Sequence, residues 1–379
     1  MQHPDNSSPQ RCTRCIMPVS YPGIRFNGDG VCSLCTESGP AEYRGHEAFK
    51  EDIGNLLRSF PDRLYDGVIG LSGGRDSTYL LHLLVRKFNC RVIAFFVDHG
   101  LIPVHTRENV RKITRQLGVK LVVLRHDSLE YCFSHQFKAW QKNPRVQTIA
   151  TFCMGCKSTI IRSFYKVSRK YRAPLLFYGW TPFEDAQYKM SLMKTDPFAA
   201  GAASYIGGYA GEIVRNPHLV ANPRCLLTQI DEFMHFYGPA KHLYDRILHT
   251  VEVKLFEHYV RWTENEAVDC IVNGYGWRSF DTMSSSWRGD CYLGPIRQHL
   301  YRTILGYNDH TPHLSALIRD GQLTRTEALA RVDRDESPGT WVIEECCRHA
   351  GISVEALNSC AERTLQEYRK VSVNRPEKQ

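Results

Sequence analysis

The sequence contains no long apolar run and no start that resembles a secretory signal. No stretch of its 379 residues approaches the roughly 18 consecutive apolar residues that a transmembrane helix requires. The polar opening MQHPDNSSPQ lacks the apolar segment of a signal peptide. We therefore expect a cytoplasmic protein that contacts no membrane. We also expect residues 1–10 to be disordered.

The sequence also lacks an internal repeat and a dense basic block. Its formal net charge of +8 is moderate, and the basic residues are interspersed with acidic ones. Binding to nucleic acid requires many Lys and Arg side chains directed at phosphates, so we do not expect a nucleic-acid partner. The hydrophobic content of 42% and charged content of 23% are typical of a globular protein. The length predicts two or three structural units.

Cysteine is abundant, with 14 residues, although disulfides are rare in the cytoplasm. Cys12-x-x-Cys15 is followed by Cys32-x-x-Cys35, a spacing that fits a four-thiolate zinc site. Four sulfur ligands leave no open position on Zn²⁺, so its predicted role is structural. Residues 11–40 are therefore expected to form a zinc knuckle.

Other cysteines have no such spacing and are expected to be small buried hydrophobic residues. They are Cys90, Cys132, Cys270, Cys291, Cys346, Cys347 and Cys360.

The Walker phosphate-binding pattern G-x-x-x-x-G-K-S/T is absent, and a different glycine-rich segment is present. The residues SGGRDS at 72–77 follow an apolar, strand-like run at 68–71 and precede a run with helical spacing at 78–84. Glycine allows a sharp turn and a close approach to a ligand. The N–H groups at the start of a helix favour an anion. The segment therefore predicts a phosphate-binding loop rather than only a tight turn.

Strand-like and helix-like segments alternate after this loop. Apolar strands are expected at 91–97, 120–124 and 174–178, and helices are expected between them. This pattern predicts an α/β domain over residues 60–185, with a Rossmann-like, doubly wound parallel sheet covered on both faces. Ligands bind beyond the carboxyl ends of such strands. We therefore expect Phe96, Val97 and Asp98, at the end of the second strand, to border a ligand site.

Residues 186–373 are predicted to be a mainly helical, acceptor-binding region. The segment 241–262 is expected to form one long helix, and the glycine-rich segment 201–211 is expected to be a mobile loop or a linker. Thr324, three residues before Glu327 and ahead of an apolar run, predicts a helix-capping box.

A second cysteine pair, Cys153-x-x-Cys156, lies between the third and fourth strands at an expected helix start. A helix N-terminus and a C-x-x-C spacing both lower a thiol pKa. The pair has three interpretations, as metal or cluster ligands, as a redox dithiol, or as an inert pair. With Cys225 as a third thiolate, it would hold a 4Fe-4S cluster that has one open iron.

Four segments together resemble the N-acetyl sugar amidotransferase family of PP-loop ATP pyrophosphatases. They are CTRCIMPVSYPGIRFNGDGVCSLC, SGGRDSTY, FCMGCK and IRDGQLTRTEAL, and the resemblance extends over about residues 11–330. It implies a fold of the PP-loop or HUP type and cleavage of ATP between its α- and β-phosphates. It also implies conversion of the acetamido group of a nucleotide-linked N-acetyl sugar to an acetamidino group, with nitrogen from a separate partner protein. No glutaminase segment is recognisable in this chain.

One segment departs from the family pattern. After the fourth strand the chain reads GWTPFED at 179–185, where the family tends to carry a Gly-Glu-Asn-like acceptor segment. The resemblance therefore predicts the ATP half of the site better than the acceptor half.

The resemblance gives the loop residues their expected roles. Arg75, where many members have Lys, would neutralise charge on the pyrophosphate, and Asp76 would bind Mg²⁺ directly or through water. Cys153 and Cys156 would serve the transfer step. The expected ATP-binding residues are Leu71, Ser72, Gly73, Gly74, Arg75, Asp76, Ser77, Val97, Asp98 and Gly179. Among the residues at the end of the second strand, Phe96, Val97 and Asp98 would contact adenine and ribose.

The functional hypotheses differ in the nucleophile that attacks the activated acceptor. Ammonia would give an amidine. Sulfur, supplied by a donor protein and carried by the cysteine pair, would give a thioamide or a thionucleobase. A non-enzymatic ATP sensor is the third hypothesis, and the intact SGGRDS loop argues against it.

Overall fold

The computed structural model describes residues 10–37, 39, 41–184, 191–195, 203–237, 240–280, 288–335 and 339–373. The predicted disorder of residues 1–10 falls outside these ranges except for residue 10. In the described part of the chain, no helix is long and apolar enough to span a membrane.

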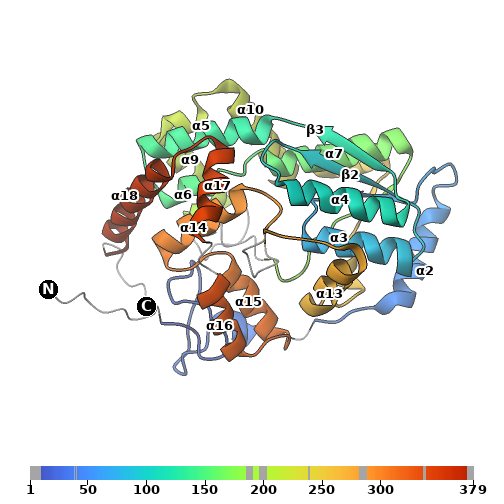
Figure 1. Cartoon of the computed structure of the whole chain (residues 1–379), viewed down its shortest axis with the longest axis horizontal. Coiled ribbons are helices and arrows are strands. Elements are labelled where there is room, and N and C mark those ends of the chain that lie inside the picture. Colours follow the sequence, from blue (N-terminus) through green and yellow to red (C-terminus); the bar gives the residue numbers. More distant parts are fainter. Residues whose placement is uncertain are drawn as a thin grey trace.

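The fold is built on a five-stranded parallel sheet with the order β3-β2-β1-β4-β5 (Figure 1). The strands are β1 (Gly67–Gly70), β2 (Val92–Asp98), β3 (Leu121–Arg125), β4 (Leu175–Phe177) and β5 (Val251–Val253). The chain starts at the centre of the sheet with β1, runs outward to β3, and then crosses to β4. The predicted Rossmann-like, doubly wound sheet is confirmed. In such sheets the site lies where the strand order reverses, beyond the end of β1.

Helices cover both faces of the sheet because successive side chains on a strand point to opposite sides. Phe95 packs in a core with α7 (Cys156–Tyr171), whereas Phe96 packs in a different core with α3 (Arg75–His82) and α4 (Val104–Leu117). Both faces are apolar, which explains why the strands read as continuous hydrophobic runs.

The other elements before β4 are α1 (Ser33–Glu37), α2 (Gly45–Arg58), the π-helical η1 (Leu83–Lys87), α5 (Ser128–Lys142) and α6 (Val146–Ile149). After β4 come α9 (Ala203–Arg215), the 3-10 helix η2 (Pro217–Val220), α10 (Pro223–Tyr237), α11 (Ala240–Leu248), α12 (Leu255–His258), α13 (Glu264–Tyr275), α14 (Leu293–Leu305), α15 (His310–Arg319), α16 (Arg325–Asp335), α17 (Thr340–Ala350) and α18 (Val354–Val373). The region after residue 186 is therefore mainly helical, as predicted.

Two predictions in this region were wrong. The segment 241–262 is not one helix, because α11 ends at Leu248 and β5 follows. His249 has a positive φ of 49°, which stops the helix, and Val251 and Val253 then pair with β4. The sheet is therefore completed by a strand from beyond residue 185.

The described part of the glycine-rich segment 201–211 lies in α9 rather than in a loop. A Cβ on Gly208 would lie 1.7 Å from the carbonyl oxygen of Met193. Glycine at this position therefore allows close helix packing and does not mark flexibility.

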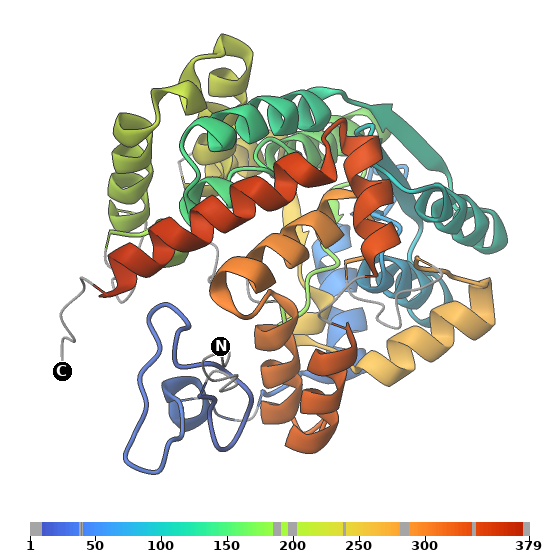
Figure 2. The ribbon, with the colours of Figure 1, turned by 60° about the vertical axis from the view of Figure 1, so that its left-hand side comes forward.

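The C-terminal helices form a second layer with the N-terminal knuckle. In Figure 2, α18 crosses the front of the molecule and lies against α5 and α14, as their contacts also show. The knuckle lies beside α16 (Figure 2), where Arg325 Nε donates to the Cys15 carbonyl oxygen at 3.0 Å. The capping box at the start of α16 is confirmed, because Glu327 N donates to Thr324 Oγ1 at 3.2 Å and Thr324 N donates to Glu327 Oε2 at 2.8 Å.

Candidate active site

The conformation of the loop between β1 and α3 depends on Gly73 and on hydrogen bonds of Ser72. Gly73 has a φ of +82°, and a Cβ there would lie 2.7 Å from Thr106 Cγ2, so the position requires glycine. Ser72 Oγ accepts a hydrogen bond from Gly74 N at 3.1 Å and lies 3.1 Å from Ser77 Oγ. No side chain caps the start of α3, so the positive end of the helix dipole is directed at the loop.

The end of β4 closes on this loop. A Cβ on Gly179 would lie 2.9 Å from Ser77 Cα, so the two backbones are in contact. Leu71 N donates to the Phe95 carbonyl oxygen at 2.8 Å, which fixes the exit of β1 beside β2. The structure thus brings the predicted residues 71–77, Asp98 and Gly179 to one edge of the sheet. Their contacts with ATP remain a prediction.

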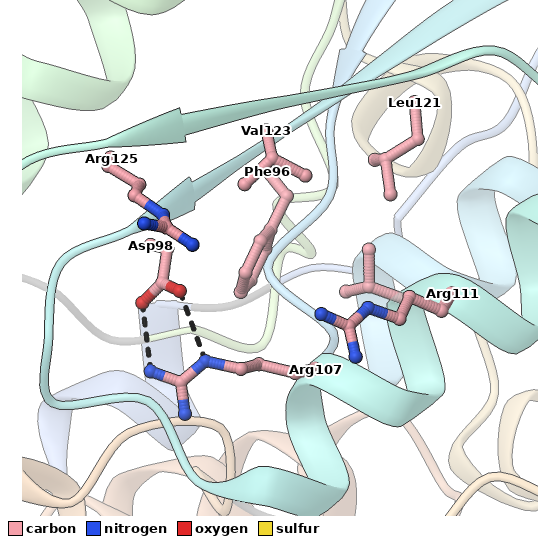
Figure 3. A pocket seen from close by; sticks show the side chains of 8 residues that line it. Phe96, Asp98, Arg107, Arg111, Leu121, Val123 and Arg125 are labelled. Atoms are coloured by element: carbon pink, nitrogen blue, oxygen red, sulfur yellow. Dashed lines mark hydrogen bonds and ion pairs between the residues drawn. The ribbon is translucent and has the colours of Figure 1, made fainter.

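The end of β2 borders a small hollow between α4 and the strands β2 and β3 (Figure 3). Phe96 and Asp98 line it, and Asp98 binds Arg107 through two contacts of 3.1 and 2.9 Å. These hydrogen bonds lower the pKa of Asp98. Val97 differs from the prediction because its side chain packs in the core on the opposite face of the sheet. Only its backbone can face a nucleotide on the α4 side.

Arg75 does not have the environment predicted for it. Its side chain is 2% exposed, and its guanidinium contacts Glu264 Oε1 at 2.6 Å and Asp76 Oδ1 at 2.8 Å. The guanidinium also lies over the ring of Trp262. The prediction that Arg75 neutralises the pyrophosphate is therefore corrected. Arg75 is an internal cation that joins α3 to α13.

Charged groups from the C-terminal half face the loop instead. A Cβ on Gly74 would lie 2.8 Å from Asp290 Oδ2, so this carboxylate lies over the loop. Burial raises the pKa of Glu184, and the nearby Asp76 and Asp290 raise it further, while Arg288 opposes the shift. Three carboxyl groups therefore gather at the loop, and carboxylate oxygens are ligands that Mg²⁺ favours. Asp290 was not predicted, because no motif surrounds it in the sequence.

The second cysteine pair lies at the start of α7, and both thiols are partly buried. Arg297, from α14, donates to Cys153 Sγ at 3.0 Å. The expected third cysteine, Cys225, has Cys132 as its partner instead: a hydrogen bond with Cys132, together with burial, raises the pKa of Cys225.

Cys291 was expected to be an inert buried residue, and the structure places it beside the pair. Burial raises the pKa of the Cys291 thiol, and Cys153 and Cys156 raise it further. All three residues border the same buried cluster. A lone cysteine 135 residues after Cys156 carries no spacing signal, which is why sequence reasoning missed it.

The four knuckle cysteines form a compact site as predicted. Their sulfur atoms all lie within 4.8 Å of one another, and all four residues are buried. The Cys15–Cys32 and Cys12–Cys35 sulfur distances are 3.7 and 4.0 Å. Tetrahedral Zn²⁺ with bonds of about 2.3 Å separates its sulfur ligands by about 3.8 Å. The donor set therefore fits a metal ion, and Zn²⁺ in particular.

Two protein families match parts of the chain. The PP-loop domain family matches residues 46–166, and the family described as "LPS biosynthesis protein WbpG-like, C-terminal domain" matches residues 290–375. The first match contains the loop at 72–77, and the second begins at Asp290. The loop at 72–77 therefore lies in the segment matched by the first family, and Asp290, which faces this loop, lies in the segment matched by the second.

Sequence relatives match the chain over limited lengths. An uncharacterized protein of Methanocaldococcus jannaschii is 23% identical over 164 residues, which are 42% of this chain and 54% of that protein. The glutamine-hydrolyzing GMP synthase of Aquifex aeolicus is 42% identical over 57 residues, which are 15% of this chain and 11% of the synthase. The matches thus span about half and about a tenth of these relatives.

Solved structures show distant likeness. The U34-tRNA thiolase NcsA from Methanococcus maripaludis, described with its 4Fe-4S cluster, is 15% identical with a TM-score of 0.34, and the match covers 83% of this chain and 86% of the thiolase. The NH3-dependent NAD synthetase from Campylobacter jejuni is 13% identical with a TM-score of 0.27, covering 54% of this chain and 91% of the synthetase.

Proposed function

We propose that this chain, a PP-loop ATP pyrophosphatase by its PP-loop and WbpG-like C-terminal domains, activates an amide oxygen with ATP and then transfers nitrogen. In the first step the acceptor oxygen attacks the α-phosphorus of ATP and pyrophosphate leaves. In the second step ammonia adds to the activated carbon, a proton is lost, and AMP leaves with the former amide oxygen. The product is an amidine.

The geometry of the loop at 72–77 is the observation that carries this proposal. The glycine turn at Gly73 and the uncapped start of α3 form a backbone cradle for the β- and γ-phosphates, which leave as pyrophosphate. Activation is needed because an amide oxygen is a poor leaving group, whereas AMP leaves readily. The cradle stabilises the charge that develops on pyrophosphate as the bond breaks.

Asp76 and Asp290 would hold Mg²⁺ at this cradle. Mg²⁺ favours carboxylate and phosphate oxygens, and both carboxylates lie at the loop. When bound, the ion withdraws negative charge from the phosphates. Arg288 takes the cationic role first predicted for Arg75, since its side chain reaches Glu184 at 3.5 Å and Asp309 at 3.6 Å within the same cluster.

Glu184 would accept the proton that ammonia loses. Its pKa is raised by burial and by two neighbouring carboxylates, and a carboxyl group with a raised pKa is a stronger base when ionised. Its place seven residues after the end of β4 puts it beyond the carboxyl end of the sheet.

The acceptor is proposed to be a nucleotide-linked N-acetyl sugar. The support is the match to a domain family named for lipopolysaccharide biosynthesis, since such pathways build N-acetylated sugars. The ammonia would come from a nitrogen-donating partner protein, and the reaction would take place in the cytoplasm.

Sulfur transfer is a second candidate, because Arg297 donates to Cys153 Sγ at 3.0 Å and the pair interacts electrostatically with Cys291, which follows Asp290 in the chain. In that case sulfide replaces ammonia: it adds to the activated carbon, a proton is lost, AMP leaves with the former oxygen, and the product is a thioamide or a thionucleobase. Product mass after incubation with ammonium or with sulfide separates the two candidates.

Pyrophosphate release by the variant Asp76→Asn tests the adenylation step. We expect wild-type protein with ATP, Mg²⁺, ammonium chloride and a nucleotide-linked N-acetyl sugar to release pyrophosphate and AMP in equal amounts. Asp76→Asn should lose this activity, whereas Asp62→Asn, at an exposed position, should keep it. Thermal unfolding of both variants shows that the loss is not a loss of fold. Normal turnover by Asp76→Asn, or ATP binding by wild-type protein without any pyrophosphate, would contradict the proposal.

A further inference from the structure

The peptide bond between Gly73 and Gly74 is held from outside the phosphate-binding loop. The indole Nε1–H of Trp277 donates to the Gly73 carbonyl oxygen at 2.9 Å, and Asn109 Nδ2 donates to the same oxygen at 3.4 Å. The side chains of both donors are buried. Two buried donors from distant parts of the chain therefore meet on one carbonyl of the loop.

The two donors belong to one packed unit. Trp277 follows the end of α13 and packs in the same core as Phe96, α3 and α4. Asn109 lies in α4 and binds the backbone of Arg278 twice, because its Nδ2 donates to the Arg278 carbonyl oxygen at 2.7 Å and its Oδ1 accepts from Arg278 N at 3.1 Å. The helix α4 and the segment after α13 therefore hold the loop carbonyl together.

The orientation of this peptide decides what the loop presents to a ligand. In a planar trans peptide the C=O and N–H groups point in opposite directions. Since the Gly73 carbonyl points to Trp277, the Gly74 N–H points away from it, to the exposed Ser72, whose Oγ accepts it at 3.1 Å. Phosphate oxygens bind to N–H groups at such a helix start. The reversed peptide would present a carbonyl oxygen to the phosphates instead.

The glycines do not select between the two orientations by themselves. Reversing the peptide changes the sign of φ at Gly74, which is −75°, and glycine adopts positive and negative φ about equally well. Gly73, at a φ of +82°, also has no Cβ that would oppose the change. The hydrogen bonds to the Gly73 carbonyl therefore select the orientation that is observed.

We propose that Trp277 is a positioning residue for ATP: its indole N–H, together with Asn109, holds the Gly73 carbonyl so that the Gly74 N–H is directed at the β- and γ-phosphates. The inference rests on the proposed function and deepens it, because it assigns the shape of the phosphate cradle to a residue 204 positions away in the sequence. In this role Trp277 acts through the loop backbone and contacts no reacting atom.

The variants Trp277→Phe and Trp277→His separate hydrogen bonding from packing. Phenylalanine keeps a large aromatic ring and removes the donor. Histidine loses the benzene ring of the indole but keeps a ring nitrogen, Nε2, in the place of the indole Nε1. A packing role predicts the larger defect for Trp277→His, whereas the proposed role predicts it for Trp277→Phe. The matched control is Trp140→Phe, because Trp140 is fully buried and its Nε1 has no hydrogen-bond partner among the described residues.

Calorimetry in the presence of Mg²⁺ compares two ligands, AMP and α,β-methylene-ATP, which cannot be cleaved between its α- and β-phosphates. Trp277→Phe should bind α,β-methylene-ATP about tenfold more weakly than wild type, the effect of one hydrogen bond to a charged group. Its affinity for AMP should be unchanged, because AMP has no β- and γ-phosphates. Trp277→His should recover part of the loss, and Trp140→Phe should show none. Circular dichroism checks that each variant is folded.

Three results would overturn the inference. They are wild-type affinity of Trp277→Phe for α,β-methylene-ATP, equal weakening of both ligands in that variant, and weaker binding of α,β-methylene-ATP by Trp277→His than by Trp277→Phe. Pyrophosphate release is measured on the same proteins with ATP, ammonium chloride and a nucleotide-linked N-acetyl sugar. The predicted pattern of affinities without pyrophosphate release by wild type refutes only the proposed function. Normal pyrophosphate release and unchanged affinities in Trp277→Phe refute only this inference.

Discussion

Replacing Glu264 with glutamine should destabilise the protein and disturb the loop at a distance. Glu264 begins α13, where the helix dipole favours an anion. Its side chain is 9% exposed and contacts Arg75 and Arg331 at 2.6 Å each. The change Glu264→Gln removes the charge but keeps the shape, so the effect reports on electrostatics rather than on packing.

The size of the effect follows from burial. Removing one partner of a buried ion pair typically costs about 3–5 kcal/mol. We expect about 3 kcal/mol, because Arg75 retains Asp76 and because the Arg331 side chain is 19% exposed. Urea unfolding followed by circular dichroism measures this difference. The control Glu367→Gln removes an exposed pair with Lys370 on α18 and should cost less than about 0.5 kcal/mol.

The effect should also depend on pH. Burial acts to raise the pKa of Glu264, but His313, Arg331 and Arg75 together lower it below its usual range. A carboxyl group with a lowered pKa stabilises the fold fully above its unfolded pKa of about 4.3, and this contribution is lost as the pH falls. The difference between wild type and Glu264→Gln should therefore be constant near neutral pH and shrink below about pH 4.3. A neutral-pH loss no larger than that of Glu367→Gln would refute this reasoning.

Two further predictions concern the loop and the knuckle. Gly73→Ala should abolish pyrophosphate release and cost about 1–3 kcal/mol in unfolding free energy, because its positive φ is combined with a clash against Thr106. The control is Gly118→Ala, because Gly118 also has a positive φ but has no atom within 4 Å of the position that a Cβ would take. This variant should lose stability through backbone strain alone and keep its activity. Equal loss of activity in both variants would contradict the claim that the contact with Thr106 disturbs the loop. Cys12→Ser should lower zinc content and melting temperature together, since a structural zinc site contributes folding energy. Unchanged zinc and stability would leave the knuckle without a metal.

The parts of the fold that depend on local patterns could be predicted from the sequence. Three of the predicted strands, β1, β2 and β4, read as apolar runs because both of their faces are covered. The edge strand β3 is also an apolar run, although its residues are partly exposed. The loop at 72–77 was recognisable because its glycines and helix start are adjacent in the chain. The strand β5 was missed because its residues VEV contain a charged side chain instead of the apolar run of β4, and a helical pattern surrounds it.

The site depends more on long-range contacts, and these left no local signal. Arg75 is neutralised by Glu264, which lies 189 residues away, so a side chain expected to face phosphate is turned into the core. Asp290 and Cys291 reach the site from the start of the C-terminal helices. Isolated residues of common types cannot be assigned to a site until the fold brings them to it.

The most direct test of the central claim is to follow the acceptor oxygen. A nucleotide-linked N-acetyl sugar labelled with ¹⁸O in its acetamido group is incubated with the protein, ATP, Mg²⁺ and ammonium chloride, and AMP is analysed by mass spectrometry. The account predicts one ¹⁸O atom in AMP for each pyrophosphate released, and no labelled AMP with Asp76→Asn. Pyrophosphate release that leaves AMP unlabelled would mean that water, and not the acceptor, attacks ATP, and would contradict the account.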